Sequence, residues 1–394
     1  MVEYKLATEE QVEFAMLAAG IMKDMLPRER IEELEHSDDG RGSYPMDVHH
    51  ALSEAGFSGL NIPEEYGGFG MDSISVAILV EEMSKIDTGF AFSFYNAGSM
   101  FPLIELSHLS KAEKQTWADR ILKGESIGTF ALTEANAGSD AGAMRTTAVK
   151  DGDEWVINGT KTFISNALTA DHFFVAAWTD KSKRVSEGVT FFLVEKDRGI
   201  QVGKKENKLG IKLSETAEII LDNVRVPEDH VIGEVGRGFA AAVGFLTDDA
   251  RIFDAVGSLG LAQAALDAAV EYAKTRRQFR KRIIDHQGLG FLIADMQIRT
   301  EAARALLYST LEAKVKGIDV GHLSSSVKTF VTDTTMQTTI DAVQVFGGYG
   351  YMKEYPVEKY MRDAKIFQIF GGTGQMLRKD ILKDIAGRDP EAGK

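Results

Sequence analysis

Four stretches of the chain carry residues whose types and spacing suit ligand binding and proton transfer. They are residues 130–140, 161–166, 276–279 and 341–379. The last stretch is rich in glycine, and glycine lets the backbone approach a ligand closely. A further feature is Asp254, which stands on an apolar helical stripe, where a carboxylate is costly unless it is paired or used. Together these residues indicate a ligand-binding site with an acid–base group beside it.

The composition limits the classes of protein to which the chain can belong. It has 394 residues, of which 44% are hydrophobic, so it can bury a large core in two or three domains. The net charge of −14 argues against a non-specific nucleic-acid binder. There is no cysteine, and the histidines lack metal-ligand spacing, so no metal site is expected. The sequence shows neither a signal-peptide pattern nor an apolar stretch of membrane-span length, and we expect a cytoplasmic protein without a membrane segment.

Three regions of the chain must position these residues. Residues 1–125 carry apolar side chains at helical spacing, which predicts an N-terminal α-helical domain. Residues 126–234 alternate short runs of Thr, Val, Ile and Phe with turns, which predicts a middle antiparallel β domain with a hairpin turn at Asn158-Gly159. Residues 235–394 show long apolar helical faces, which predict a C-terminal α-helical bundle. The expected fold class is therefore α+β.

The segment 341–379 resembles the C-terminal signature of the acyl-CoA dehydrogenase family. It combines Gln-Val-Phe-Gly-Gly at 344–348, Glu-Tyr-Pro at 354–356, Met-Arg-Asp-Ala-Lys-Ile at 361–366 and Ile-Phe-Gly-Gly-Thr-Gly-Gln at 369–375. The resemblance covers nearly the whole chain. It implies the family's three domains, a FAD cofactor, an acyl-CoA thioester ligand and a homotetramer. It also implies an electron-transferring flavoprotein as the electron acceptor.

The resemblance also assigns FAD contacts. Residues 130–140 are similar to the family's Ala-Leu-Thr-Glu-Pro-x-Ala-Gly-Ser-Asp motif, with Ala135 in place of the proline, and residues 276–279 resemble a segment that meets the FAD of a neighbouring subunit. The alternative is that these are core and loop residues without a ligand. The FAD contacts implied by the resemblance are Phe130, Leu132, Thr133, Gly138, Ser139, Phe163, Ser165, Arg276, Gln278, Phe279, Gln344, Gly347, Gly348, Thr373 and Gln375.

The family's catalytic glutamate is missing from both of the positions it is known to occupy. Most members carry it where this chain has Gly371, and others carry it where this chain has Ala250, next to the arginine that matches Arg251. Gly371 keeps the backbone N–H that stabilises charge on the thioester oxygen and loses only the carboxylate. Asp254 lies one turn after Ala250 and is the candidate for a relocated base; an ion pair with Arg251 is the alternative. Restoring a glutamate at residue 371 or 250 is expected to raise dehydrogenation about 10²–10⁴-fold.

The substrate side of the site follows from the same resemblance. Residues 87–96 match the helix that lines the acyl pocket and are unusually aromatic, which suits a compact or cyclic acyl group; helix packing is the alternative. Three functions stay open: dehydrogenation with a relocated base, chemistry without an α base (1,4-desaturation of a cyclic enoyl-CoA or desulfination of a sulfinyl-CoA), and FAD and CoA binding without catalysis. The catalytic candidates are Asp254 and Gly371, and the expected substrate contacts are Phe92, Tyr95, Ser139, Asp248, Arg251, Phe370, Gly371 and Gly372.

Overall fold

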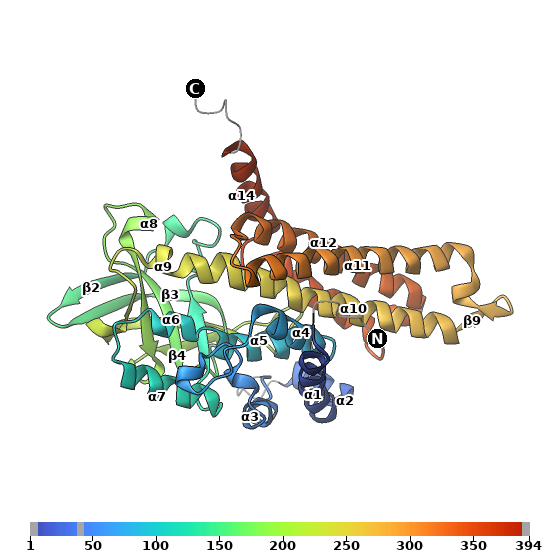
Figure 1. The fold of residues 1–394 in the computed structure, drawn as a ribbon, viewed down its shortest axis with the longest axis horizontal. Coiled ribbons are helices and arrows are strands. Elements are labelled where there is room, and N and C mark those ends of the chain that lie inside the picture. The colour runs from blue at the N-terminus through green and yellow to red at the C-terminus, as the bar shows by residue number, and fades with distance from the viewer. Residues whose placement is uncertain (1–6, 38–42, 388–394) are drawn as a thin grey trace.

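The computed structural model describes residues 7–37 and 43–387, without the side chains of residues 243, 244 and 246–248. Figure 1 shows an elongated molecule with a β sheet at one end and a helical bundle that stretches to the other. Helices from the N-terminal part of the chain pack along one side of this bundle. The expected α+β architecture, with helices, a sheet and then helices in chain order, is confirmed.

The N-terminal part of the chain is helical because its apolar stripes are bounded by capping residues. Thr8 starts α1 and Ser110 starts α7, each with a reciprocal capping box that satisfies free backbone donors. The side chains of Asp72 and Asp87 cap the N-termini of α4 and α5. The helices are α1 (Glu9–Met25), α2 (Arg28–His36), α3 (Met46–Glu54), α4 (Ser73–Ser84), α5 (Thr88–Ser99), α6 (Phe101–Glu105) and α7 (Lys111–Leu122).

The sheet has the strand order β6-β7-β3-β2-β4-β5-β8, with β1 also paired to β4. It is not wholly antiparallel, as the sequence had suggested, because β1 and β2 both pair with β4 in parallel. Strand β4 is buried along its whole length, as expected of a strand covered on both faces. The strands are β1 (Gly128–Ala131), β2 (Thr147–Asp151), β3 (Glu154–Ser165), β4 (His172–Trp178), β5 (Val189–Glu195), β6 (Gln201–Lys205), β7 (Thr216–Pro227) and β8 (Val231–Ile232).

The hairpin predicted at Asn158-Gly159 is wrong, because β3 continues through these residues. The pairing of β3 with β7 shifts between Ile157 and Gly159, which marks a β-bulge. A Cβ at Gly159 would lie 2.2 Å from Oγ1 of Thr146, so glycine is needed here for close packing rather than for a turn. The turn between β2 and β3 lies instead at Gly152, whose φ is +62°.

The C-terminal part of the chain forms the bundle, and its first helix is interrupted. Helix α9 passes into a π-helical turn, η6, directly before α10, and such turns are frequent at functional sites. Helix α10 is long and apolar enough to cross a membrane, contrary to our expectation, but 89% of its most apolar window is buried, as in a core helix. The elements are α9 (Gly238–Gly244), η6 (Phe245–Ala250), α10 (Arg251–Thr275), β9 (Arg277–Gln278), β10 (Lys281–Arg282), α11 (Gln287–Val315), α12 (Gly321–Phe346), α13 (Val357–Phe367) and α14 (Gly374–Gly387).

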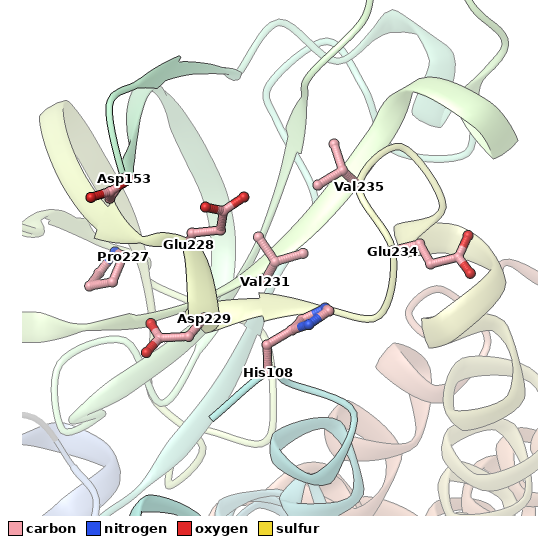
Figure 2. A pocket seen from close by; sticks show the side chains of 8 residues that line it. All are labelled: His108, Asp153, Pro227, Glu228, Asp229, Val231, Glu234 and Val235. Atoms are coloured by element: carbon pink, nitrogen blue, oxygen red, sulfur yellow. The ribbon is translucent and has the colours of Figure 1, made fainter. Parts of the chain in front are cut away.

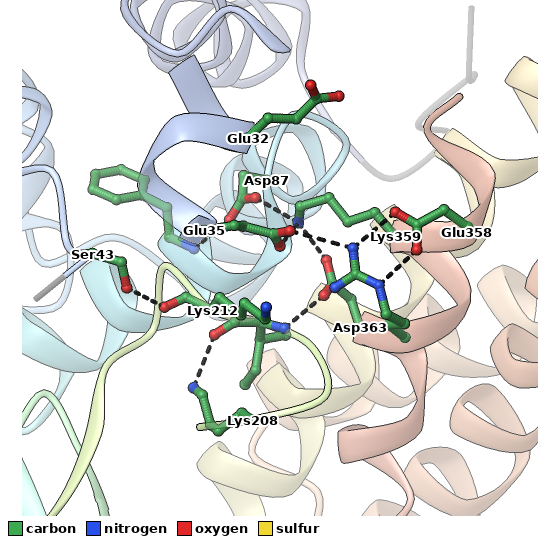
Figure 3. A network of polar contacts seen from close by, with 12 residues as sticks. Glu32, Glu35, Ser43, Asp87, Lys208, Lys212, Glu358, Lys359 and Asp363 are labelled. Carbon is green, nitrogen blue, oxygen red and sulfur yellow. Dashed lines mark hydrogen bonds and ion pairs between the residues drawn. The ribbon is translucent and has the colours of Figure 1, made fainter. Parts of the chain in front are cut away.

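A network of charged groups joins the three parts of the chain (Figure 3). Nζ of Lys359 on α13 lies 2.7 Å from the Asp87 carboxylate that caps α5, 2.5 Å from Asp363 and 3.6 Å from Glu35 on α2. The backbone N–H of Ile211, in the loop before β7, donates to Asp363 at 2.6 Å. Burial alone would lower the pKa of Lys359, but the surrounding carboxylates raise it well above its ordinary value. The network therefore holds α13 against α5, the helix that carries the expected acyl-pocket residues.

Candidate active site

The centre of the candidate site is a buried ion pair that the sequence did not reveal. Asp254 on α10 is 5% exposed, and its Oδ2 lies 2.8 Å from Nζ of Lys328 on α12. The expected alternative, an ion pair of Asp254 with Arg251, is wrong: Arg251 donates to Oγ of Ser325 at 2.9 Å and to Asp380 at 3.0 Å. Burial raises the pKa of Asp254, and the Lys328 ammonium opposes this. Burial likewise lowers the pKa of Lys328 against the pull of Asp254.

The glycine loop after α13 lies directly against this ion pair. Gly371 and Gly372 have φ values of +58° and +95°, a region that residues with a side chain rarely adopt. A Cβ at Gly371 would lie 2.0 Å from Oδ2 of Asp254 and 2.6 Å from Nζ of Lys328. The carboxylate of Asp254 thus occupies the space in which a side chain at residue 371 would begin. A side chain at residue 371 would require Asp254 and Lys328 to move, which argues against simple restoration of a glutamate there.

Aromatic rings surround the same loop. Phe92 on α5 stacks on Phe370, with ring centroids 4.8 Å apart, and Tyr95 stacks on Phe253 at 4.5 Å. The sequence predicted Phe92, Tyr95 and Phe370 as substrate contacts but missed Phe253, which directly precedes Asp254. Burial raises the pKa of the Tyr95 hydroxyl well above its ordinary value, so this group stays neutral. The side chain of Asp248, another expected contact, lies outside the described residues.

A bulge in β3 presents Phe163 to the outside of the sheet. The pairing of β3 with β7 shifts between Lys161 and Ile164, and Phe163 has a φ of +58°, a strained value for an aromatic residue. As a result its ring is 62% exposed although its neighbours are buried. Strain of this kind marks positions where a side chain is re-aimed for function. The ring offers the flat apolar wall that a flavin requires.

The 132–140 loop is tied to this bulge. The N–H of Thr162 donates to the carbonyl of Thr133 at 2.9 Å. Lys161 is fully buried, and its Nζ donates to Glu134 at 2.9 Å and to the carbonyl of Leu132 at 3.0 Å. Burial lowers the pKa of Lys161 to about 8, and Glu134 opposes the shift. Glu134 therefore anchors the loop and does not itself face a ligand.

The remaining residues expected on this side of the site differ in their placement. Thr133 and Ser165 are half-buried beside the bulge, and Gly138 and Ser139 are exposed at the end of the loop. A Cβ at Gly138 would meet no other described atom within 4 Å. Phe130 instead packs on Phe191, with ring centroids 5.0 Å apart, at the edge of a hydrophobic core. Phe130 thus supports the wall rather than forming its open surface.

A second group of expected FAD contacts lines a cavity of about 540 Å³ at the far tip of the bundle. Arg276, Gln278, Gly347 and Gly348 all contribute to it. The guanidinium of Arg276 lies 5.5 Å from the Tyr349 ring centroid, and a Cβ at Gly348 would meet no other described atom within 4 Å. An arginine beside open, side-chain-free backbone suits a pyrophosphate. These residues, together with the exposed wall at Phe163, fit FAD.

The two groups lie at opposite ends of the molecule. Figure 1 shows the tip at β9 far from the sheet of the same chain. Thr373, which caps α14 through its hydroxyl, and the exposed Gln375 lie beside the glycine loop instead. Lys328 lies beside that loop, and about 18 residues of α12, or about 27 Å of helix, separate it from the tip. Phe279 is 89% exposed and Gln344 is also exposed at that tip. One chain therefore does not bring all the expected FAD contacts together.

Another cavity, of about 680 Å³, lies at the outer end of the sheet (Figure 2). Carboxylates dominate its lining, so it does not suit the phosphate-bearing FAD or CoA. The residues that line it are His108, Asp153, Pro227, Glu228, Asp229, Val231, Glu234 and Val235. Among the described residues no group of three or more His, Asp or Glu side chains could hold a metal ion, and this cavity is no exception.

Comparisons with known proteins agree along the whole chain. Residues 8–125, 129–224 and 236–386 match the N-terminal, middle and C-terminal domains of acyl-CoA dehydrogenases. The chain is 38% identical over 384 residues to an acyl-CoA dehydrogenase of Bacillus subtilis, covering 96% of this chain and 99% of the relative. It is 38% identical over 375 residues to the caffeyl-CoA reductase–Etf complex subunit CarC of Acetobacterium woodii, covering 94% and 96%. Its fold matches butyryl-CoA dehydrogenase of Megasphaera elsdenii with a TM-score of 0.90 at 37% identity, covering 98% and 100%.

Proposed function

The chain belongs to the acyl-CoA dehydrogenase family of FAD-dependent oxidoreductases that act on the CH–CH group of an acyl-CoA, and we propose that Asp254 is the catalytic base of this member. The observation that carries the proposal is the position of its carboxylate. Oδ2 lies 2.0 Å from the point where a side chain at Gly371 would begin. A carboxylate therefore lies directly beside Gly371, although both known glutamate positions lack one, and this supports the proposal.

The residues around the glycine loop divide the reaction between them. The Gly371 N–H binds the thioester oxygen, on which negative charge develops as the α C–H bond breaks. The Asp254 carboxylate accepts the α proton. A bound FAD would supply the acceptor for the hydride of the β carbon, so that loss of the α proton and the β hydride would give a 2-enoyl-CoA. The stacked pairs Phe92–Phe370 and Tyr95–Phe253 hold the acyl group away from water.

We propose further that each FAD site is built from two copies of the chain. The wall at Phe163 and the tip cavity at Arg276 lie at opposite ends of one molecule, as Figure 1 shows. Several apolar side chains of the bundle are exposed in the single chain, which supports coverage by further copies, as in a homotetramer. These are Phe279, Phe291, Ile298, Phe330 and Ile340. The domain limits near residues 125 and 234 and the cytoplasmic location stay predictions.

An electron-transferring flavoprotein is the proposed electron acceptor. The relative CarC is named as a subunit of a caffeyl-CoA reductase–Etf complex, and it aligns with 94% of this chain. Because the FAD of this family must be reoxidised after each turnover, a partner flavoprotein completes the cycle. Stimulated turnover of butyryl-CoA on addition of such a partner would support this assignment, and turnover that depends only on dissolved oxygen would contradict it.

Exchange of α protons tests the role of Asp254 apart from hydride transfer. Butyryl-CoA and 3-thiabutyryl-CoA both carry α protons, but the latter has sulfur in place of the β carbon and cannot donate a hydride. We expect wild-type protein to exchange the α protons of 3-thiabutyryl-CoA with deuterated water. Asp254→Asn keeps the size of the side chain but cannot accept a proton, so exchange should fall about 10²–10⁴-fold.

A matched control lies on the same helix. Asp267 is an exposed residue of α10 whose carboxylate accepts from Gln263 at 2.8 Å. Asp267→Asn makes the same chemical change away from the site and should leave exchange unchanged. If Asp254→Asn exchanges as fast as wild type, Asp254 is not the base. If wild type shows no α exchange but a cyclic enoyl-CoA bleaches the flavin, or a sulfinyl-CoA releases sulfite, the chemistry that needs no α base is correct instead.

A further inference from the structure

Lys328 is a fully buried lysine whose contacts all belong to the candidate site. Its Nζ forms the ion pair with Asp254 at 2.8 Å and donates to the backbone carbonyls of Phe370 and Gly372, the latter at 3.4 Å. An ammonium has three N–H donors and no acceptor. All three donors thus end on the proposed base and on the two residues that flank Gly371.

The surroundings of Lys328 on α12 explain why these contacts matter. The buried residues near it on this helix are small hydroxyl-bearing and apolar ones, such as Ser324, Val327, Val331 and Thr335. A lysine in such a place is strongly unfavourable unless it is paired, and removing one partner of a buried pair leaves an uncompensated charge. The buried ammonium of Lys328 is therefore stabilised by Asp254 and by the carbonyls of the glycine loop.

The contact with Phe370 also orients the N–H of Gly371. The carbonyl of residue 370 and the N–H of residue 371 belong to one planar trans peptide, so they point in opposite directions. Because the carbonyl of Phe370 faces Lys328, the N–H of Gly371 points away from α12. Gly371 is exposed, and it follows Phe370, whose ring stacks on that of Phe92. A thioester oxygen arriving there meets a donor that is already aligned.

We propose that Lys328 is a positioning residue that aligns two parts of the site at once: it keeps Asp254 ionised at the α carbon and turns the Gly371 N–H toward the thioester oxygen. The inference rests on the proposed role of Asp254 as the base. It assigns Lys328 no contact with the substrate. Its two effects are separable, because one acts through charge and the other through backbone hydrogen bonds.

The charge effect has a definite sign. Three charged or titratable groups lie around the Asp254 carboxylate. They are Lys328 on α12, Arg251 one turn earlier on α10, and Tyr95 on α5, which is neutral. Burial raises the pKa of Asp254, whereas Lys328 and Arg251 lower it. Removing the Lys328 ammonium therefore raises the pKa of Asp254 further. Because the carboxylate is the active form of a base, the rising limb of the exchange rate against pH must move to higher pH.

The experiment uses the FAD-loaded protein with 3-thiabutyryl-CoA labelled with ¹³C at the thioester carbonyl. For Lys328→Met we expect the rising limb of the α-exchange rate against pH to move up by one pH unit or more. At a fixed pH below this limb, each unit lowers the exchange rate about tenfold. We also expect the bound C=O stretching frequency to move toward its value in water, because the aligned donor is lost. Lys328→Gln can still donate to the loop carbonyls, so it should shift the limb but keep more of the carbonyl shift.

A matched control separates a specific effect from the loss of any buried lysine. Lys161 is also fully buried and paired, with Glu134, but lies under the flavin wall. Lys161→Met should lower FAD content and leave the pH limb of the loaded fraction in place. If Lys328→Met does not fold, the double variant Asp254→Asn/Lys328→Met leaves no unpaired charge, and its C=O frequency is compared with that of Asp254→Asn.

The outcomes distinguish this inference from the proposed function. The proposed role of Lys328 is overturned if Lys328→Met keeps both the pH limb of α exchange and the bound C=O frequency of wild type. It is also overturned if Lys161→Met shifts the pH limb by as much as Lys328→Met does. In the double variant, a C=O frequency equal to that of Asp254→Asn also overturns it. If instead Asp254→Asn keeps its exchange rate, the proposed base is wrong, while the carbonyl frequency of Lys328→Met still decides whether this residue holds the loop.

Discussion

Replacing Gly371 by alanine should be far more disruptive than the addition of one methyl group suggests. The residue has a φ of +58°, and a side chain in the left-handed region costs about 1–2 kcal/mol. The new Cβ would also lie 2.0 Å from Oδ2 of Asp254 and 2.6 Å from Nζ of Lys328, so the ion pair must rearrange. Disrupting a buried ion pair costs about 3–5 kcal/mol. We therefore expect Gly371→Ala to lower the free energy of unfolding by several kcal/mol and to abolish α exchange.

Gly372→Ala is the matched control for this prediction. Its φ of +95° imposes comparable backbone strain, but the nearest atom to a Cβ there is the flexible end of Leu377, at 3.2 Å. This variant should lose only about 1–2 kcal/mol. The assay is denaturant unfolding at fixed protein and FAD concentrations, because bound cofactor and assembly both shift the apparent stability.

Equal losses in the two variants would refute the reasoning, because they would show that strain alone, and not the crowding of Asp254, determines the cost. A double-mutant cycle makes the same point independently. In an Asp254→Ala background the carboxylate is gone, so Gly371→Ala should cost less than it does in the wild-type background, with Nζ of Lys328, 2.6 Å from the new Cβ, as the remaining close contact. The same crowding predicts that Gly371→Glu will not restore α,β-dehydrogenation, although the sequence alone suggests that it should.

Two further predictions concern assembly and acid stability. Arg276→Ala should lower FAD retention and the oligomeric state together, measured by flavin absorbance and light scattering; a stable monomer with full flavin would contradict it. Burial lowers the pKa of His172 to about 3 and of His49 to about 4, so both are neutral in the folded protein. Below their ordinary pKa of about 6.5 the unfolded chain binds more protons, so the free energy of unfolding should fall by about 2 kcal/mol per histidine between pH 6.5 and 5. His172→Gln should flatten this decline in denaturant titrations, and an unchanged slope would show that His172 already binds its proton in the folded state.

The sequence alone was sufficient for the fold class and for the cofactor. Apolar stripes at helical spacing in residues 1–125 and 235–394, and β-rich runs between them, reflect local periodicity, which a sequence displays directly. The sequence also singled out Gly347, Gly348 and Phe163, because the motifs that contain them are contiguous stretches, and all three are exposed in the structure. The absence of a glutamate at residue 371 needed no structure either.

The tertiary structure alone showed that the Asp254 carboxylate lies beside Gly371 and that Lys328 pairs with it. Asp254 and Lys328 are far apart in the sequence and lie on different helices, and no local pattern in α12 marks a lysine that pairs across the bundle. The sequence favoured Arg251 as the partner of Asp254 because residues three apart share a helix face. Packing overrode this preference, since Arg251 turns to Ser325 and Asp380.

The two bulges in β3 are backbone features that the sequence alone did not predict. Asn158-Gly159 has the composition of a hairpin turn, yet it lies within a strand because Thr146 packs against Gly159 too closely for any side chain. The second bulge leaves Phe163 exposed, and its strained φ is stabilised by pairing with β7 on either side. Such positions depend on neighbours distant in the chain, which supply the free energy that local propensity lacks.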